Sequence, residues 1–320
     1  MNTWFETFQR RHTAAVVVVL GLALLAAPFL PAFALSSQLV VLAAAVACFG
    51  LPHGALDLTL IQGASSGSWR AVASAVLIYL LGAGAVLVAW LGAPVLTLIG
   101  FLLITLIHFG LGDTAELRGP QRALESVARG GFSTIAPLLF QPIITLELFA
   151  LLVGPDSAAP LNAATAAIMS GAGWLWGASV GAAVLWRIMA RRPGWLRATA
   201  ELVLTTAVFA VLHPLVSFLL YFNFVHSVRH LAELGTARFP GSASHALHWL
   251  LRASLPLTMA TLGLAALAGV LFGSTRSLDE SLIRTIFWTL SSLTVPHMIL
   301  VAWWHNQGGP PPGDLFARGG

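Results

Sequence analysis

Long runs of apolar residues separated by short polar segments dominate the chain. Runs near 20 residues are long enough to cross the hydrocarbon core of a bilayer as a helix. The expected spans are 14–34, 38–61, 71–92, 94–111, 131–153, 163–189, 198–212, 215–232, 249–272 and 281–304. The spans 198–212 and 215–232 meet at His213-Pro214, where we expect a turn because proline disrupts a continuing helix; one kinked helix through this point is the alternative. The pattern predicts an all-α, polytopic bundle of about 8–10 transmembrane helices.

Composition supports a membrane protein. Hydrophobic residues make up 58% of the chain and charged residues 9%, with a mean hydropathy of +0.86. An ordinary soluble domain is roughly one-quarter charged. The longest polar stretches, 112–130 and 233–247, are too short for a soluble domain. We therefore expect one helical membrane domain over residues 1–306, followed by a disordered Pro- and Gly-rich tail over 307–320.

The 16 basic residues are all arginines, and their distribution predicts the orientation. With ten spans and a cytoplasmic N-terminus, most of them fall on the cytoplasmic side: Arg10, Arg11, Arg70, Arg118, Arg122, Arg129, Arg187, Arg191, Arg192, Arg197 and Arg238. The abundance of alanine and arginine without lysine is typical of a GC-rich bacterial genome, and hence of an inner membrane. The first apolar run exceeds the apolar core of a secretory signal peptide, so a retained helix is expected.

Two classes of partner or linkage are disfavoured. No stretch combines clustered cations with stacking aromatics, which disfavours nucleic acid as a partner. The single cysteine, Cys48, excludes an internal disulfide and disfavours a thiolate metal site.

Five histidines lie within apolar segments, where ionisable side chains are costly and usually functional. His226 and His230 are spaced i and i+4, so on a helix both point the same way and one ion can take both. His53, His108 and His297 lie in GLPHGALD, IHFGLGD and TVPHMIL. Counted along the expected spans, all five fall at depths of roughly 16 to 24 Å from the outer face. The five histidines together predict a metal centre.

An imidazole-only site suits iron, copper, zinc or nickel, and disfavours calcium and magnesium. Asp57 follows His53 by four residues, and Asp113 follows His108 by five. Both acids are candidate ligands, but we favour them as acceptors that hold the distal ring N–H of a ligating imidazole. Their alternative role is to mark the cytoplasmic ends of their helices.

Helix breakers accompany the histidine motifs. Glycine allows close approach of backbone or ligand, and proline frees a carbonyl, as expected where helices line a cavity. The residues are Gly50, Pro52, Gly54, Gly110, Gly112 and Pro296.

The motifs GLPHGALD and HFGLGD, the FxxxHxxRH pattern of residues 222–230, and Pro296-His297 together resemble the Brp/Blh family of membrane-integral β-carotene dioxygenases. The resemblance spans about residues 49–300, in the family's order. The second motif has Gly112-Asp113 where the family pattern leads us to expect two acids.

The resemblance implies an Fe(II) enzyme that cleaves the central double bond of β-carotene with O₂ to give two all-trans retinal molecules. The family's iron-binding histidines map onto His53, His108, His226 and His230. His297 belongs to a family motif as well, as a further ligand or as a residue orienting substrate or oxygen. A retinal-binding rhodopsin is a candidate acceptor of the product.

The residues suit this chemistry. Four neutral imidazoles leave Fe(II) open positions for O₂, and a C40 hydrocarbon dissolves in membrane lipid and can enter sideways between helices. Tyr221, one of two tyrosines, is a candidate partner of bound oxygen or a packing anchor. Aromatic side chains near the histidines are candidates for contacting the polyene. They are Phe109, Phe222, Phe224 and Trp288.

Other classes stay open. A membrane di-iron desaturase or hydroxylase normally needs about eight histidines, and this chain has one HxxxH pair. A non-catalytic metal or proton transporter predicts carboxylates along a path to both faces. A haem-binding subunit needs bis-histidine pairs across two helices, for which His213 is at most a weak candidate.

Overall fold

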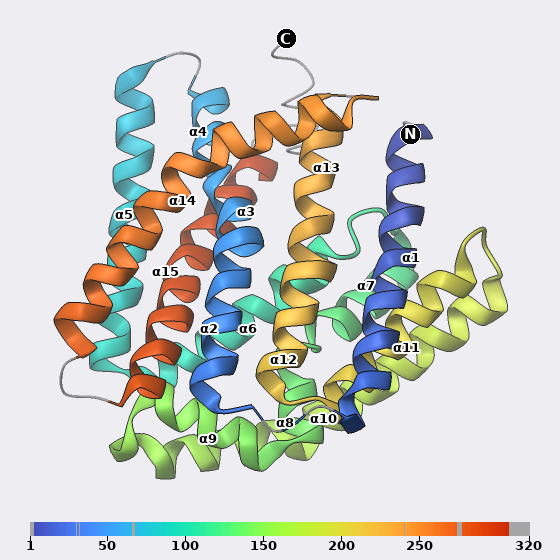
Figure 1. Cartoon of the computed structure of the whole chain (residues 1–320), viewed down its shortest axis with the longest axis horizontal. Helices are drawn as coiled ribbons and strands as arrows, with labels where there is room; N and C mark the ends of the chain where they lie inside the picture. The colour runs from blue at the N-terminus through green and yellow to red at the C-terminus, as the bar shows by residue number, and fades with distance from the viewer. Residues whose placement is uncertain are drawn as a thin grey trace. The chain divides into compact units, whose positions relative to one another are not determined.

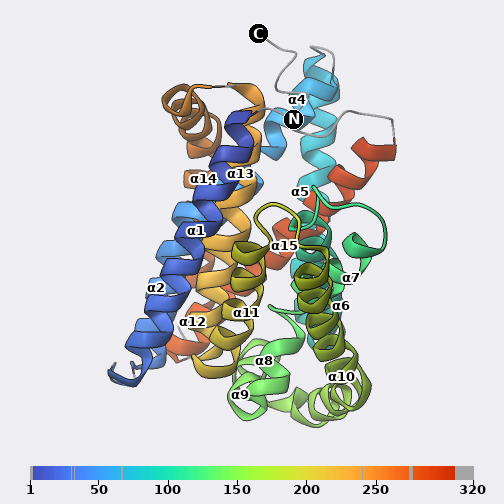
Figure 2. The same ribbon diagram turned by 90° about the vertical axis from the view of Figure 1, so that its right-hand side faces the viewer.

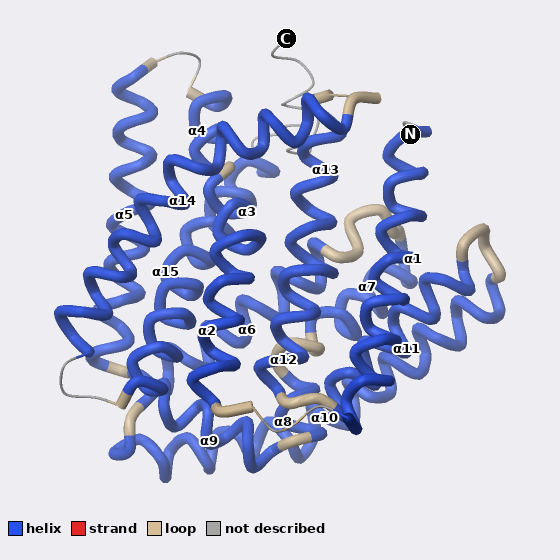
Figure 3. Tube along the Cα trace, viewed as in Figure 1, coloured by secondary structure: helices blue, strands red, loops and turns tan. Residues whose placement is uncertain are grey.

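The computed structural model describes residues 3–29, 31, 33–65, 68–239, 241–273 and 277–306. Within these residues the secondary structure is helical and strands are absent, with short loops between the helices (Figure 3). This confirms the all-α class. The tail expected over 307–320 lies outside the described residues.

Six helices among the described residues are long and apolar enough to cross a membrane. They are Thr7–Phe29, Leu35–Ala64, Trp69–Gly92, Pro94–Gly112, Ala243–Leu267 and Leu278–Trp303. These correspond to six of the ten expected spans and identify a membrane protein. The full count of ten is not reproduced.

Helices also form over the four other expected spans, and one of these spans is interrupted. The 131–153 span is broken at Gln141 into α8 (Ile135–Phe140) and α9 (Pro142–Val153), because Pro142 disfavours helical backbone at the preceding residue, and Gln141 has φ −138° and ψ 60°. α10 (Ala158–Ala190) covers 163–189 as one helix. α11 (Trp195–Val211) is 17 residues long.

The turn expected at His213-Pro214 is present. Leu212 has extended backbone, with φ −88° and ψ 154°, so α11 ends there. α12 (Pro214–Leu219) then begins with Pro214 in its first turn, where the missing N–H costs nothing. The Nδ1 atom of His213 accepts a hydrogen bond from the Leu215 N–H at 3.3 Å and caps the new helix.

The chain divides into two compact units, which we describe separately. Unit 1 contains the described parts of 1–7, 43–93 and 227–320, and unit 2 those of 8–42 and 94–226. α1 (Thr3–Ala26) and α2 (Leu35–Ala45) each contribute to both units. The 3₁₀ turn η1 (Ala27–Phe29) follows α1.

Unit 1 is built from two pairs of packed helices (Figure 1). α15 runs along α5, and α14 packs against both α3 and α15. Its elements are the π-helical η2 (Val46–Gly50), α3 (Leu51–Ala55), α4 (Asp57–Ala64), α5 (Trp69–Gly92), α13 (Val228–Arg238), α14 (Ala243–Gly273) and α15 (Leu278–Asn306).

One polar contact joins α5 to α15. Trp90, which is 1% exposed, donates its indole N–H to the Ser291 hydroxyl at 2.7 Å. Trp90 also stacks on Trp288 at 5.4 Å between ring centroids. The pair fixes the register of the two helices because a buried indole N–H needs an acceptor.

In unit 2, α7 packs against both α6 and α10, and α10 also packs against α11 (Figure 2). The remaining elements are α6 (Pro94–Gly112), α7 (Gly119–Gly130), the 3₁₀ turn η3 (Pro155–Ser157) and the π-helical η4 (Leu220–Ser227). α6 and α7 approach closely at glycines: a Cβ on Gly130 would lie 2.1 Å from the Leu106 carbonyl oxygen.

The stretch expected as the loop 112–130 therefore contains a packed helix. Arg129, assigned from the sequence to a cytoplasmic loop, is 4% exposed and buried among carboxylates. The sequence reasoning went wrong because α7 is polar overall, yet it buries Gln121, Glu125 and Arg129 on one face. The loop expected over 233–247 is also shorter, since α13 ends at Arg238 and α14 begins at Ala243.

Candidate functional site

In unit 1, His53 lies on a short helix bounded by two irregularities. α3 follows the π-helical η2 directly and ends at Ala55, and Leu56 separates it from α4. Pro52 in the first turn donates no hydrogen bond, so the preceding turn can widen. The result places the His53 ring 4.3 Å from the ring of His230 and 5.3 Å from the ring of His297.

Asp57 meets His297, not the nearby His53. Nδ1 of His297 lies 2.7 Å from Oδ1 and 2.9 Å from Oδ2 of Asp57, across 240 positions in the sequence. Because a carboxylate only accepts, the Nδ1 atom carries the proton and Nε2 is the nitrogen able to bind a metal. Both side chains are buried, with Asp57 6% and His297 7% exposed.

Tyr79 completes this arrangement. Its hydroxyl lies 2.9 Å from Oδ2 of Asp57 and 3.2 Å from the Leu293 carbonyl oxygen, and these two acceptors share its single proton. We call Tyr79, Asp57 and His297 the Tyr79 triad. The sequence reasoning did not single out Tyr79; its signal was that the chain has two tyrosines, both within apolar runs.

Unit 2 contains a second triad. Nδ1 of His226 lies 2.8 Å from Oδ1 of Asp113, and the Tyr221 hydroxyl lies 2.6 Å from Oδ2. That hydroxyl is also 2.9 Å from the Arg129 carbonyl oxygen. We call Tyr221, Asp113 and His226 the Tyr221 triad; all three are at most 2% exposed.

His108 faces His226 within unit 2. The two Nε2 atoms are 3.2 Å apart, and the rings are 4.9 Å apart at 69°. Two imidazole nitrogens bound at about 2.1 Å to one ion, at angles between a right angle and the tetrahedral angle, lie about 3.0 to 3.4 Å apart. The pair therefore has the spacing of two adjacent ligands of one metal ion.

The ring separations in unit 1 fit as well. Rings bound through one nitrogen each at the same angles have centroids roughly 4.5 to 5.2 Å apart. The separations of His53 from His230 and His297, 4.3 and 5.3 Å, lie close to this range. An all-imidazole donor set suits iron among other transition metals, so the residues present fit the expected ion.

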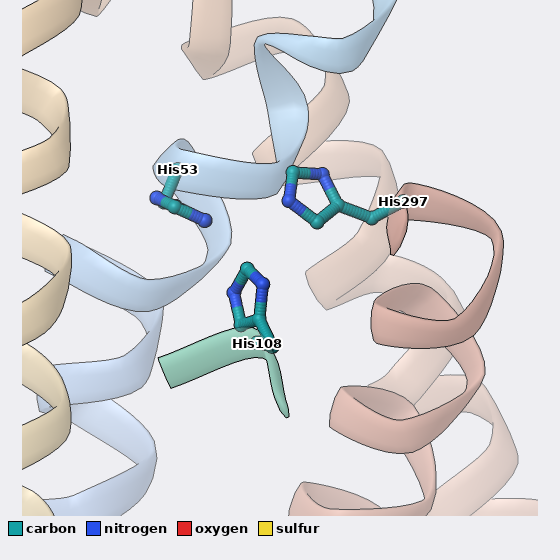
Figure 4. A group of neighbouring side chains, drawn as sticks. All are labelled: His53, His108 and His297. Atoms are coloured by element: carbon teal, nitrogen blue, oxygen red, sulfur yellow. The ribbon is translucent and has the colours of Figure 1, made fainter. Parts of the chain in front are cut away.

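Figure 4 draws three of these side chains: His53 and His297 of unit 1, whose rings turn toward each other from α3 and α15, and His108 from α6 of unit 2. His53 and His297 are buried and His108 is half-buried, and each offers one ring nitrogen to a metal ion. Within unit 1, His53 and His297 are two members of a candidate metal-binding group. This group contains His297, which sequence reasoning left between a ligand and an orienting role.

The four candidate aromatics divide into two pairs. Phe109 lies 4.4 Å from the His226 ring, and Phe222 stacks on the same ring at 6.2 Å. In contrast, the Phe224 carbonyl accepts a hydrogen bond from Nε2 of His12 at 2.8 Å. Trp288 stacks on Trp90. Phe109 and Phe222 are therefore the pair placed beside a site histidine within unit 2.

A buried cluster of arginines and glutamates adjoins the Tyr221 triad. Nη1 of Arg129 lies 2.8 Å from Oε1 of Glu201, its Nε lies 3.6 Å from Oε2 of Glu125, and Arg187 pairs with Glu125. Burial alone would lower the pKa of Arg129, but the carboxylates of Glu201, Glu125 and Asp113 raise it above its ordinary value. The cluster holds a positive charge near Asp113.

Known proteins resemble this chain along most of its length. Residues 44–305 match the family model described as β-carotene 15,15′-dioxygenase. The chain belongs to this family. It is 30% identical to a probable β-carotene 15,15′-dioxygenase, Blh, of Halobacterium salinarum, over 94% of this chain and 95% of the relative.

A second relative of the family, a β-carotene 15,15′-dioxygenase from uncultured marine bacterium 66A03, is 30% identical over 81% of this chain and 90% of its own length. No solved structure matches the chain. The resemblance drawn from the histidine motifs is thereby confirmed at the level of the family, and the chain is a dioxygenase of the carotenoid-cleaving class.

Proposed function

We propose that this protein cleaves the central double bond of β-carotene with O₂ and releases two molecules of all-trans retinal. The C=C bond breaks and two C=O bonds form, so one O₂ balances one β-carotene. Membership of the family supports the reaction. The observation that carries the site is the facing of His108 and His226, whose Nε2 atoms lie 3.2 Å apart.

We propose Fe(II) as the cofactor, held by His53, His108, His226 and His230. When bound, iron supplies O₂ activation beside the polyene. The protein's own residues fix the imidazoles: Asp113 accepts the Nδ1 proton of His226 and so directs Nε2 to the ion. A neutral imidazole held in one tautomer is a better ligand than one that must reorganise.

Tyr221 was expected from the sequence to contact bound oxygen or to anchor packing. Its hydroxyl instead meets Asp113 and the Arg129 carbonyl, which supports a positioning role through the carboxylate. Asp57 and Asp113 likewise act as acceptors for histidine N–H groups. We propose that His297 lies beside the reacting centre, as a further ligand or as a residue that orients substrate or oxygen.

Phe109 and Phe222 are the aromatic side chains that we place against the polyene. Both are buried and pack beside His226, so they present apolar surface next to a proposed ligand. Trp288 is a weaker candidate because its ring stacks on Trp90, and Phe224 stays a candidate. The reaction removes no proton from the alkene, so an apolar wall without an acid or base suits the substrate.

We propose that the site lies within the bacterial inner membrane, with the N-terminus cytoplasmic, surrounded by lipid that delivers the hydrocarbon substrate. A retinal-binding rhodopsin is the proposed acceptor of the product. The six apolar helices support the membrane setting.

The test is expression in cells that accumulate β-carotene. We expect the orange colour to fade and retinal to appear in extracts. Persistence of β-carotene in cells that contain the iron-loaded protein would contradict the assignment of β-carotene as the substrate. Purified protein should contain about one iron per chain without haem absorbance, whereas two irons would favour a di-iron desaturase.

His230→Ala tests the ligand set. We expect loss of cleavage and a lower iron content, because one proposed imidazole ligand is removed. His248→Ala is the matched control, since His248 is exposed on α14 and its Nδ1 atom bonds the Ser244 carbonyl of the same helix. Full activity of the His230 variant would contradict the assignment.

A further inference from the structure

The Tyr79 triad repeats the Tyr221 triad atom by atom. In each, a tyrosine hydroxyl sits between Oδ2 of an aspartate and a backbone carbonyl oxygen. In each, Nδ1 of a histidine meets Oδ1 of the same aspartate, at 2.7 Å in unit 1 and 2.8 Å in unit 2. The two tyrosines used are the two of the whole sequence.

The repetition matters because the two histidines enter the proposed function differently. His226 is one of the four proposed iron ligands, whereas His297 lies outside that set. Yet the hydrogen bonds that fix the tautomer and the ring are the same for both. A packing histidine needs a satisfied N–H, but it does not need its partner carboxylate held in turn by a tyrosine hydroxyl.

The geometry points to Tyr79 as a positioning residue that, through Asp57, directs Nε2 of His297 to the metal as an additional ligand. The inference rests on the proposed iron site and deepens it. Two observations carry it: the triad geometry, and the 5.3 Å separation of the His297 ring from the His53 ring, close to that of two rings on one ion.

The hydroxyl of Tyr79 acts on orientation. A carboxylate can rotate about its Cβ–Cγ bond, and His297 is within reach of both of its oxygens. Donation from Tyr79 to Oδ2 holds Asp57 in one rotation. The Leu293 carbonyl, four residues before His297 on α15, accepts a share of the same hydroxyl proton, so the triad ties the ring to its own helix.

The test uses metal-depleted full-length protein in detergent micelles, titrated with Co(II). The visible absorption of Co(II) reports the number and geometry of its ligands. We compare Tyr79→Phe and Tyr221→Phe with Ser254→Ala, a matched control that removes a buried hydroxyl bonded only within α14. The thermal unfolding of each metal-free variant is measured in parallel.

Both tyrosine variants should weaken Co(II) binding about tenfold, at the lower end of the effect of outer partners on metal affinity. The control should stay within about twofold of the wild type. A role confined to packing would lower the unfolding temperature of the metal-free Tyr79→Phe protein without changing the Co(II) affinity or spectrum. That result, with Tyr221→Phe weakened as expected, would overturn the inference.

Two further variants keep the inference testable if Tyr79→Phe folds poorly. Asp57→Asn should weaken Co(II) binding about 10- to 100-fold. His297→Ala should weaken it as well and change the Co(II) spectrum, and added imidazole should restore both by filling the vacated position. Failure of imidazole to restore the spectrum in a folded variant counts against His297 as a ligand.

Comparing carotene cleavage with metal binding in the wild type and in the variants distinguishes failure of this inference from failure of the proposed function. Carotene cleavage and metal binding that persist unchanged in all the Tyr79 triad variants remove this inference alone. Triad-dependent Co(II) binding without carotene cleavage removes the proposed substrate and leaves the inference standing. Absence of Co(II) and iron binding in the wild type removes the inference and the iron site together.

Discussion

The two triads make the same hydrogen bonds at opposite ends of helices. Asp57 is the first residue of α4, where the positive end of the helix dipole favours a carboxylate. Asp113 directly follows the last residue of α6, where the dipole disfavours one. Arg129 stands near Asp113 and supplies the missing positive charge. One hydrogen-bond pattern thus needs two kinds of electrostatic support.

The tyrosines of the two triads also differ in burial. Tyr221 is 1% exposed, whereas Tyr79 is half-buried. A carboxylate sealed from water needs a fixed counter-charge more than one near a helix N-terminus does. The ion cluster of α7, α10 and α11 is therefore best understood as support for the Tyr221 triad.

The largest expected effect comes from removing the positive charge of Arg129, which supports only the Tyr221 triad. Arg129→Met removes a buried cationic partner from Glu201 and one of the two arginine partners of Glu125, which should lower the free energy of unfolding by about 3 to 5 kcal/mol. Thermal unfolding in detergent, followed by circular dichroism, measures it. Arg197→Met, an exposed site on the same helix as Glu201, should change it by less than about 0.5 kcal/mol. Equal stability of the two variants would remove the role given to Arg129.

Two glycines in the histidine motifs, one in each unit, differ in how closely other atoms approach them. A Cβ on Gly110 would lie 2.4 Å from the Ser126 carbonyl oxygen, so Gly110→Ala should separate α6 from α7 and cost about 1 to 3 kcal/mol. A Cβ on Gly54 meets nothing within 4 Å, and Ala should stabilise α3 by up to about 1 kcal/mol. Opposite shifts of the unfolding temperature are expected. A similar loss in both would show that α3 is packed as tightly as α6.

The smallest expected effect is the contribution of His213, which belongs to neither triad, to the loss of stability at acidic pH. Burial lowers the pKa of His213, whose Nδ1 accepts the Leu215 N–H only when unprotonated. The unfolded chain takes up this proton near its ordinary pKa of about 6.5, before the folded protein does. The free energy of unfolding therefore falls as the pH drops below that value, until the pH passes the lower folded pKa.

His213→Asn isolates this contribution. Asparagine keeps a side-chain acceptor at the helix cap but does not titrate. The difference in unfolding temperature between pH 7.5 and pH 5.5 should be smaller in the variant than in the wild type. An unchanged difference would assign the acid sensitivity to other groups, including the triads.

Sequence reasoning succeeded where the signal is local. Apolar length predicted the six long helices, and Pro214 predicted the break after α11, because both depend on neighbouring residues alone. It failed at α7, where a polar average hid a buried face, and at residue 141, where Pro142 divides an apolar run into two short helices.

The acids show why local spacing is not enough. Asp57 lies four residues from His53 and Asp113 five from His108, so sequence neighbours looked like natural partners. Leu56 interrupts the first helix, and α6 ends at Gly112 before the second acid. Each carboxylate therefore turns to a histidine more than a hundred positions away.

Composition and short motifs were enough to predict the helical class, the membrane setting and the family, and to nominate the candidate metal-binding histidines. The tertiary structure decided which carboxylate and which phenol stand behind which imidazole. Such pairings follow from how distant helices pack, and hydropathy along one chain does not encode them.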